Sequence, residues 1–438
     1  MKYSKLWLVA LAMSFSSYLQ AQFIIDAQVR PRAEFRNGFK ELNAPDEGPA
    51  FYTEQRTRLS VGFTQEKYKI KVTVQDVRMW GSTNQPYKTD DNNTLHFSEA
   101  WGQYFFTDKL SFKAGRQIIR YHNERFFGSS NWQPQGRSHD ALLLIYEDLE
   151  SGWKIDIGGA FNQNAYEPSL LQGTFYDGVV NYKHMEYVWL TKRLEKLEIN
   201  AMALNNGYQN VTDSSGVAQQ SFALLLDYKV NDRLKIGGES YLQMGKNRAG
   251  VDNSAHMLAA YATYKTDMTP IKLAVDYMSG TSYGSSKDHS FNSLFGSNHK
   301  FYGYMDYFYV ANPHRMQGTV YNTGLLDFRI MTEWKTGANS SLKANIHQFF
   351  SPVDIVDIND VSQSYSSNLG TEIDLVMTWK LDPAVTINLG YSQMFATESM
   401  EQIKGTVTGY TGEASALNNW AWVMVDFRPQ LFNSSKKD

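Results

Sequence analysis

The chain of 438 residues contains no cysteine. This absence excludes a disulfide framework, a cysteine-ligated zinc site and a cysteine nucleophile. Continuous apolar runs are also missing after the first 23 residues, so no membrane-spanning helix is predicted there, because such a helix needs about 20 apolar residues in a row. The formal net charge is only −3. Mild acidity of this kind argues against a nucleic-acid-binding protein, which would carry a concentrated basic surface.

The first 21 residues have the organisation of an export signal. Lys2 and Lys5 precede an apolar run from Leu6 to about Met13, and a serine-containing stretch ends at Ala21. This order predicts a secretory signal peptide that is cleaved after Ala21. The alternative, a membrane anchor, is disfavoured because the apolar run is too short to span a bilayer. Removal of the two lysines would change the formal net charge from −3 to −5.

The composition is typical of a protein whose strands, and not helices, cross a membrane. Aromatic residues make up 14% of the chain, whereas only 42% of the residues are hydrophobic. Strands that cross the outer membrane need only about 10 residues of alternating polarity, because their polar half faces a lumen. We therefore predict an all-β fold, a transmembrane antiparallel β-barrel of the outer membrane. A periplasmic β-sandwich or propeller would show the same alternation.

The lengths of the connections favour the barrel over these alternatives. About eighteen segments have strand-like patterns, and the connections between them alternate strictly between short turns and long polar loops. A membrane barrel has short periplasmic turns and long external loops in this alternation. The predicted strands lie near 23–37, 53–65, 67–80, 94–106, 108–121, 137–148, 152–162, 180–193, 197–206, 217–230, 233–245, 255–266, 269–280, 319–335, 340–351, 366–380, 384–396 and 419–432. Residues 22–438 are thus expected to form one barrel domain, with a short polar tail at 433–438.

Charged residues occupy one face of the first two predicted strands. In "AQVRPRAEFRN" (27–37), Arg30, Arg32 and Arg36 alternate with apolar residues, and Arg56 and Arg58 do so in the next strand. Because successive side chains of a strand point to opposite faces, these arginines are predicted to face the lumen. Two interpretations remain open. The arginines either pair with nearby carboxylates and brace the wall, or form a constriction that attracts anions. We also predict bulges near residues 75 and 115, where the alternation changes phase.

Several segments resemble a known family. The segments "RPRAEFRNGF", "QRTRLSVGF" and above all "GRQIIRYHNERFFGSSNWQPQGRSHDALLLIYE" (115–147) are similar to the alginate export family of outer-membrane porins. The resemblance implies an eighteen-stranded passive channel with an arginine-bearing constriction, which passes an anionic uronic-acid polysaccharide outward. The residues that match the family pattern are Gly115, Arg116, Gln117, Arg125, Trp132, Gly136, Arg137 and Asp140. The predicted pore-lining, anion-binding residues are Arg30, Arg32, Arg36, Arg56, Arg58, Arg116, Arg125 and Arg137.

The longest connection, residues 281–318, is unusually aromatic for an external loop. Such an apolar surface would aggregate if it were exposed to water, so we expect it to be buried. The favoured interpretation is that the loop folds into or over the pore as a constriction or lid. The alternative is a loop that packs on a neighbouring subunit or only plugs the wall. The candidate lid residues are Phe301, Tyr302, Tyr304, Asp306 and Tyr307.

Catalytic and metal-binding patterns are weak. The tripeptide "SHD" at 138–140 lies in a predicted strand, where its three side chains cannot converge, and the sequence has no zincin, phosphate-loop or nucleophile-elbow motif. Asp354, Asp357 and Asp360 in an external loop are weak Ca²⁺ candidates, but their spacing is not that of an EF-hand. We therefore predict a channel for anionic or polar solutes, with no enzyme activity and no cofactor. A structural or adhesive barrel is the alternative.

Overall fold

The computed structural model describes residues 21–44, 48–82, 95–163, 176, 182–209, 215–308, 313–316, 318–404 and 412–435. Residues 1–20, which hold nearly all of the predicted signal peptide, lie outside the described residues, as do residues 436–438 of the predicted tail.

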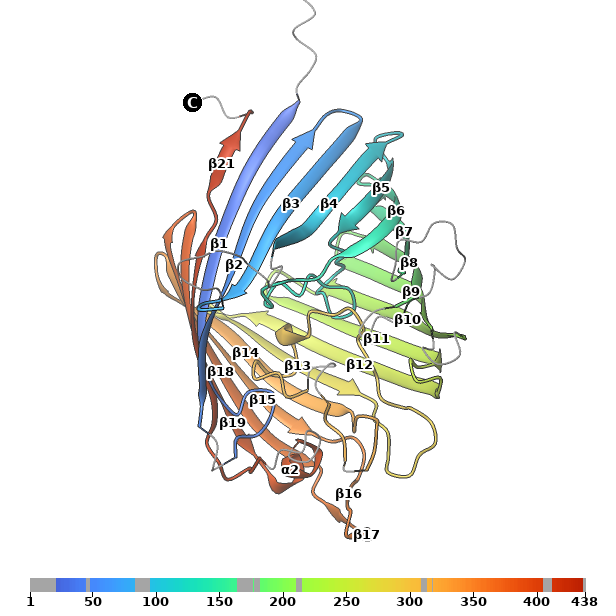
Figure 1. Cartoon of the computed structure of the whole chain (residues 1–438), viewed down its shortest axis with the longest axis vertical. Coiled ribbons are helices and arrows are strands. Elements are labelled where there is room, and N and C mark those ends of the chain that lie inside the picture. Colours follow the sequence, from blue (N-terminus) through green and yellow to red (C-terminus); the bar gives the residue numbers. More distant parts are fainter. Residues whose placement is uncertain are drawn as a thin grey trace, which may run out of the picture.

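In the described part of the chain, nineteen strands form a single antiparallel sheet that closes into a barrel (Figure 1). Closure occurs where β1 pairs with β2 on one side and with β20 and β21 on the other. The strands β20 and β21 are two parts of one wall strand, which is interrupted at Arg428 and Pro429, so eighteen strands form the wall of the barrel. The predicted all-β barrel of about eighteen strands is therefore confirmed. The barrel strands are β1 (Gln22–Asn37), β2 (Ala50–Thr64), β3 (Tyr68–Met79), β4 (Leu95–Phe105), β5 (Leu110–Gln117), β6 (His139–Asp148), β7 (Trp153–Phe161), β8 (His184–Arg193), β9 (Leu197–Gln209), β10 (Gly216–Lys229), β11 (Leu234–Lys246), β12 (Asp252–Lys265), β13 (Pro270–Met278), β14 (Leu325–Gly337), β15 (Ser340–Phe350), β18 (Asn368–Asp382), β19 (Val385–Ala396), β20 (Asn418–Phe427) and β21 (Gln430–Asn433).

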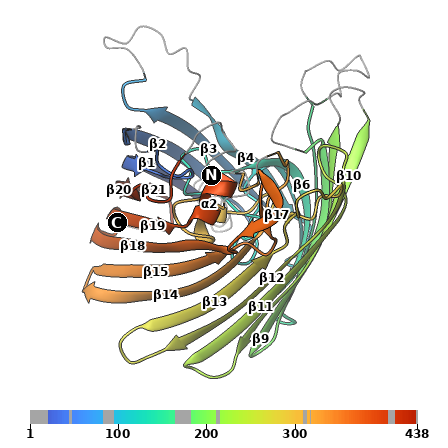
Figure 2. The same ribbon diagram turned by 90° about the horizontal axis from the view of Figure 1, so that it is seen from below.

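The two ends of the barrel differ in their connections. One end carries only short turns, and both the start of β1 and the end of β21 lie there, because Ile24 pairs with Asn433 (Figure 1). Long connections occupy the opposite end. They include the hairpin of β16 (Ile355–Asp357) and β17 (Asp360–Tyr365) and the helix α2 (Glu398–Lys404). Figure 2 shows α2 and β17 in front of the opening of the ring. Among the described residues, no helix is long and apolar enough to cross a membrane.

Strand β10 shows how the alternation of the sequence builds the wall. Phe222 and Leu224 point outward and are 42% and 48% exposed, whereas Ser221 and Leu225, on the opposite face, are 0% and 1% exposed. An apolar outer face is the surface that lipid solvates best, because lipid offers no partner to a polar group.

Three predicted boundaries and one predicted bulge need correction. The strand predicted near 319–335 begins only at Leu325, the strand predicted near 180–193 begins at His184, and the strand predicted near 108–121 ends at Gln117. A register shift does occur between Thr73 and Val74, close to the predicted bulge near residue 75. The bulge predicted at Gly115 is wrong, because β5 keeps one register through this residue with both neighbours.

Two long connections fill the interior of the barrel. They are the 118–138 loop, between β5 and β6, and the 279–324 loop, between β13 and β14, of which residues 279–308, 313–316 and 318–324 are described. The loops contact each other through a bridge between Phe127 and Phe295, whose ring centroids lie 5.4 Å apart. Tyr307 and Phe308 are fully buried. The principal buried apolar cluster is thus built by these loops against the lumenal wall.

Candidate functional site

The arginines in the middle of β1 and β2 hold the 118–138 loop by its backbone carbonyls. Arg30 donates to the carbonyl oxygens of Asn131 (2.7 Å) and Trp132 (3.1 Å), and Arg32 donates to the Trp132 carbonyl at 2.8 Å. Arg56 donates to the Asn131 side-chain oxygen at 3.0 Å. Irregular backbone inside a barrel leaves carbonyls without partners, and a guanidinium, with five N–H donors, satisfies several of them at once.

Carboxylates neutralise two of the predicted pore arginines in this region. Glu34 is fully buried and accepts hydrogen bonds from Arg32 at 2.8 Å and Arg36 at 2.9 Å. Glu34 also accepts a hydrogen bond from the indole of Trp420 at 2.9 Å, while Glu54 forms a second ion pair with Arg32. Arg32 and Arg36 thus brace the seam where β1 meets β20.

Arg125 anchors the 118–138 loop to the opposite wall. Its guanidinium is 1% exposed and forms ion pairs with Glu239 of β11 (2.9 Å) and Asp276 of β13 (2.8 Å). It also donates to the Tyr302 hydroxyl at 3.0 Å and lies over the Phe301 ring, 4.0 Å from its centroid. A buried charge with this many partners ties both loops to the barrel, since removal of one partner would leave the other charge uncompensated.

The prediction that Arg116 lines the lumen is wrong. Arg116 alternates with Gly115 and Gln117 and shares the outward face of Phe112, and its side chain is 43% exposed. It forms an ion pair with the equally outward Asp140 at 2.6 Å. The prediction rests on the match of Arg116 to the family pattern, and the alternation of β5 places it on the outer face instead. Arg137 does lie on the lumenal side, where it donates to the Gly296 carbonyl at 2.9 Å.

The candidate lid residues of the 279–324 loop lie against the lumenal wall. Phe301, Tyr302 and Tyr307 are 8%, 1% and 0% exposed. The Tyr304 hydroxyl accepts a hydrogen bond from Lys343 of β15 at 2.5 Å. Asp306 pairs with His299 at 2.9 Å within the loop.

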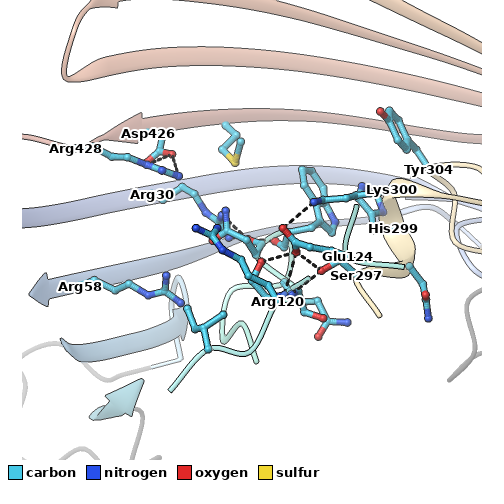
Figure 3. A pocket seen from close by; sticks show the side chains of 18 of the residues that line it. Arg30, Arg58, Arg120, Glu124, Ser297, His299, Lys300, Tyr304, Asp426 and Arg428 are labelled. Atoms are coloured by element: carbon cyan, nitrogen blue, oxygen red, sulfur yellow. Dashed lines mark hydrogen bonds and ion pairs between the residues drawn. The ribbon is translucent and has the colours of Figure 1, made fainter. Parts of the chain in front are cut away.

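A cationic cavity of about 1060 Å³ lies on the short-turn side of the loops, and we call it the short-turn chamber (Figure 3). Eight Lys or Arg side chains and four Asp or Glu side chains line it, which gives it a formal net charge of +4. The cations are Arg30, Arg58, Lys71, Lys113, Arg120, Lys300, Lys343 and Arg428, and the anions are Glu99, Glu124, Asp306 and Asp426. Of the predicted pore arginines, Arg30 and Arg58 line this chamber.

An aromatic stack runs along one side of the short-turn chamber. The Trp132 and His299 rings are stacked with centroids 4.3 Å apart, and the His299 and Tyr304 rings are stacked at 5.2 Å. The Arg32 guanidinium lies over the Trp132 ring, 3.8 Å from the ring centroid. Flat apolar faces beside cationic groups are suited to solutes that combine C–H surfaces with negative charge.

Glu124 joins the two loops at the edge of this chamber (Figure 3). Its carboxylate accepts hydrogen bonds from the Ser129 backbone N–H at 3.0 Å and the Ser297 hydroxyl at 2.8 Å, and pairs with Lys300 at 3.0 Å. Although burial by itself raises the pKa of this carboxyl, these donors outweigh burial and lower the pKa to about 2. The carboxylate therefore stays ionised and holds the 118–138 loop against the 279–324 loop.

A second cavity, of about 790 Å³, lies on the long-loop side, and we call it the long-loop chamber. It is lined by Arg137, His139, Asn206, Tyr208 and Asn247 with further residues of the 279–324 loop. Asn298 lines both chambers, so the two cavities adjoin each other at the loops.

The weak Ca²⁺ candidates are not brought together. In the described residues, the one cluster of potential metal ligands is His122, Glu198 and Asp227, and it includes none of the three aspartates. Asp357 instead accepts hydrogen bonds from the backbone and side chain of Asn359, and Asp360 accepts them from Ser362. These are local turn contacts.

Six chamber cations were not among the predicted pore-lining residues: Lys71, Lys113, Arg120, Lys300, Lys343 and Arg428. Lys113 had a detectable signal, because it shares a strand face with Ser111, Gly115 and Gln117. Lys71 of β3 contacts the carboxylate of Glu99 on the neighbouring strand β4 at 2.6 Å, diagonally across the strand pair. Arg120 lies in the irregular 118–138 loop, where no periodicity reports the direction of a side chain.

The eighteen-stranded barrel, with an apolar belt outside and a charged lumen, defines an outer-membrane porin-type channel, and comparisons with known proteins agree. The structure is similar to Pseudomonas aeruginosa OccK9 (OpdG), with a TM-score of 0.60, 8% identity and coverage of 94% of this chain and 99% of that one. It is also similar to Acinetobacter baumannii OccAB4, with a TM-score of 0.60, 9% identity and coverage of 95% and 99%. The corresponding values for Pseudomonas aeruginosa OpdK with vanillate are 0.57, 10%, 94% and 99%. At such identities the likeness shows the fold alone.

The family itself comes from the sequence. The model of the alginate export family matches residues 22–412, and the chain belongs to this family. A comparison with curated proteins gave no match. The protein is thus a channel of the cell outer membrane and not an enzyme.

Proposed function

We propose that this channel passes carboxylate-bearing saccharides, of the uronic-acid class, through the short-turn chamber. The observation that carries the proposal is the net charge of +4 in this chamber, within a chain whose formal net charge is −3. Cations that line a water-filled constriction raise the local concentration of anions. Tyr304, at the end of the aromatic stack, offers a ring face for the C–H surface of a sugar ring, and the surrounding cations offer partners for its carboxylate.

The distribution of partners indicates which arginines serve this function. Arg30 and Arg58 line the chamber and donate to neutral acceptors, the Asn131 and Trp132 carbonyls and the Gln75 amide oxygen, so both keep their full charge. A solute carboxylate can share their field without first breaking an ion pair.

Single-channel recording of the purified barrel in a salt gradient tests the proposal. The wild-type channel should be anion-selective, and a uronic-acid tetrasaccharide should block its current. Replacing Arg58 and Lys113 together with Gln should lower the anion-to-cation permeability ratio by at least about tenfold, since each charge at about 5 Å in a water-like medium contributes about 0.8 kcal/mol and the two together contribute about 1.6 kcal/mol.

Arg116→Gln is the matched control for this pair, because it removes a positive charge from the outer face of the wall. It should leave selectivity at the wild-type value. Cation selectivity of the wild-type channel would overturn the proposal, and an absence of conductance would favour a structural or adhesive barrel.

A further inference from the structure

The long-loop chamber differs in chemistry from the short-turn chamber. Its charged lining residues are Arg137, Arg248 and Asp288, which give a formal net charge of only +1. The Asp288 carboxylate already accepts hydrogen bonds from Ser290 and Asn247, at 2.9 Å in each case. Charge is therefore a minor part of what this cavity offers to a solute.

Amides and aromatic rings make up most of the remaining lining. Six amide side chains face the cavity: Asn206, Gln219, Asn247, Asn292, Asn298 and Asn322. An amide presents a donor and an acceptor side by side, which matches the two roles of neighbouring sugar hydroxyls. Tyr208, Phe295 and Tyr321 are half-buried around the same cavity and add faces for C–H surfaces.

One buried group in this lining has an unused hydrogen-bonding capacity. Asn206 is 1% exposed, and its side-chain oxygen has no hydrogen-bond partner. It lies on the inward face of β9, directly across from Gln219 of β10, whose amide donates to the Asn253 oxygen at 2.9 Å. A buried acceptor without a donor costs about 1–3 kcal/mol, so a hydroxyl that enters the chamber would recover this free energy.

From these observations we infer that the long-loop chamber is a binding site for uncharged, hydroxyl-rich sugar units. An anionic group gains less here than in the short-turn chamber, whereas a neutral pyranose finds amides for its hydroxyls and rings for its faces. Because Asn298 lines both chambers, a saccharide bound here lies next to the loops that separate it from the cationic chamber. The inference rests on the proposed function only in taking both chambers as parts of one pore.

Blockade of single-channel current by neutral maltohexaose, added on the long-loop side, tests the inference. We expect resolved, saturable blockade, and a polyethylene glycol of the same hydrodynamic size should block far more weakly. Asn206→Ala should raise the half-saturating maltohexaose concentration by about 3- to 10-fold, the effect of losing one hydrogen bond. Tyr321→Ala, in the 279–324 loop and not in a strand, provides a second variant that does not depend on assembly of the barrel strands.

The same recordings separate this inference from the proposed function. Arg58→Gln should lower anion selectivity and leave the maltohexaose affinity unchanged, whereas Asn206→Ala should do the reverse. Equal blockade by polyethylene glycol, or wild-type maltohexaose affinity in both Asn206→Ala and Tyr321→Ala, would overturn the sugar site even if anion selectivity holds. Specific glucan blockade in a cation-selective channel would overturn only the proposed function.

Discussion

Neutralising Glu124 should loosen the contact between the two loops that fill the barrel. In Glu124→Gln, an NH₂ donor would replace one carboxylate oxygen, and it would face either the Lys300 ammonium or the donors of Ser129 and Ser297. The lowering of the carboxyl pKa from 4.5 to about 2 corresponds to a contribution of up to about 3 kcal/mol from the ionised form. Loss of that free energy would raise the population of separated loops by up to about 100-fold.

The assay is single-channel current at neutral pH, where separated loops should appear as larger mean conductance and stronger fluctuations. The matched control is Glu99→Gln, which removes a negative charge from the same chamber but acts on Lys71 of the wall and not on either loop. If both variants show the same conductance, the change comes from charge alone and Glu124 does not join the loops.

Acid should reproduce the effect in the wild-type channel. Because the pKa of Glu124 is lowered in the folded state, its stabilisation is complete above about pH 4.5 and is lost as the pH falls toward 2. At pH 3 about 2 kcal/mol of it should already be gone. Current fluctuations should therefore rise between pH 4.5 and 3 in the wild type but not in Glu124→Gln, and equal pH dependence in both would contradict the assignment.

Two further predictions concern the fold. Burial lowers the pKa of Lys404 in α2 to about 7, so the unfolded chain binds a proton that the folded chain lacks between about pH 7 and 10.4. The heat stability of the barrel, measured by gel mobility in detergent, should therefore rise with pH over this window. It should rise less in Lys404→Met. Gly115→Ala should weaken the barrel by more than about 1 kcal/mol in the same assay, because Gly115 has a φ of +115° and a Cβ there would lie 2.3 Å from the Ala100 carbonyl oxygen; wild-type stability would refute this argument.

The wall of the barrel was predictable because its signal is local. A period of two residues, with turns at one end and long loops at the other, is enough to give the strand number and the outward face. The filling of the barrel by the 118–138 and 279–324 loops was predictable only as a tendency of aromatic residues to be buried. Its actual contacts are long-range, since the partners Glu239 and Asp276 lie 114 and 151 residues from Arg125 in the sequence. No pattern within a strand reports such a pairing.

The sequence left two interpretations of the lumenal arginines: they brace the wall, or they attract anions. In the structure, the charge of each arginine's hydrogen-bond acceptors decides which of the two roles it can have. Arg32, Arg36 and Arg125 contact carboxylates, so their charges are cancelled where they lie. Arg30 contacts backbone carbonyls of the 118–138 loop, which are neutral, and its charge persists in the chamber. Whether an arginine braces or attracts is therefore decided by its nearest acceptors, which are Glu34 of the same strand for Arg32 and Arg36 and a loop about 100 residues away for Arg30.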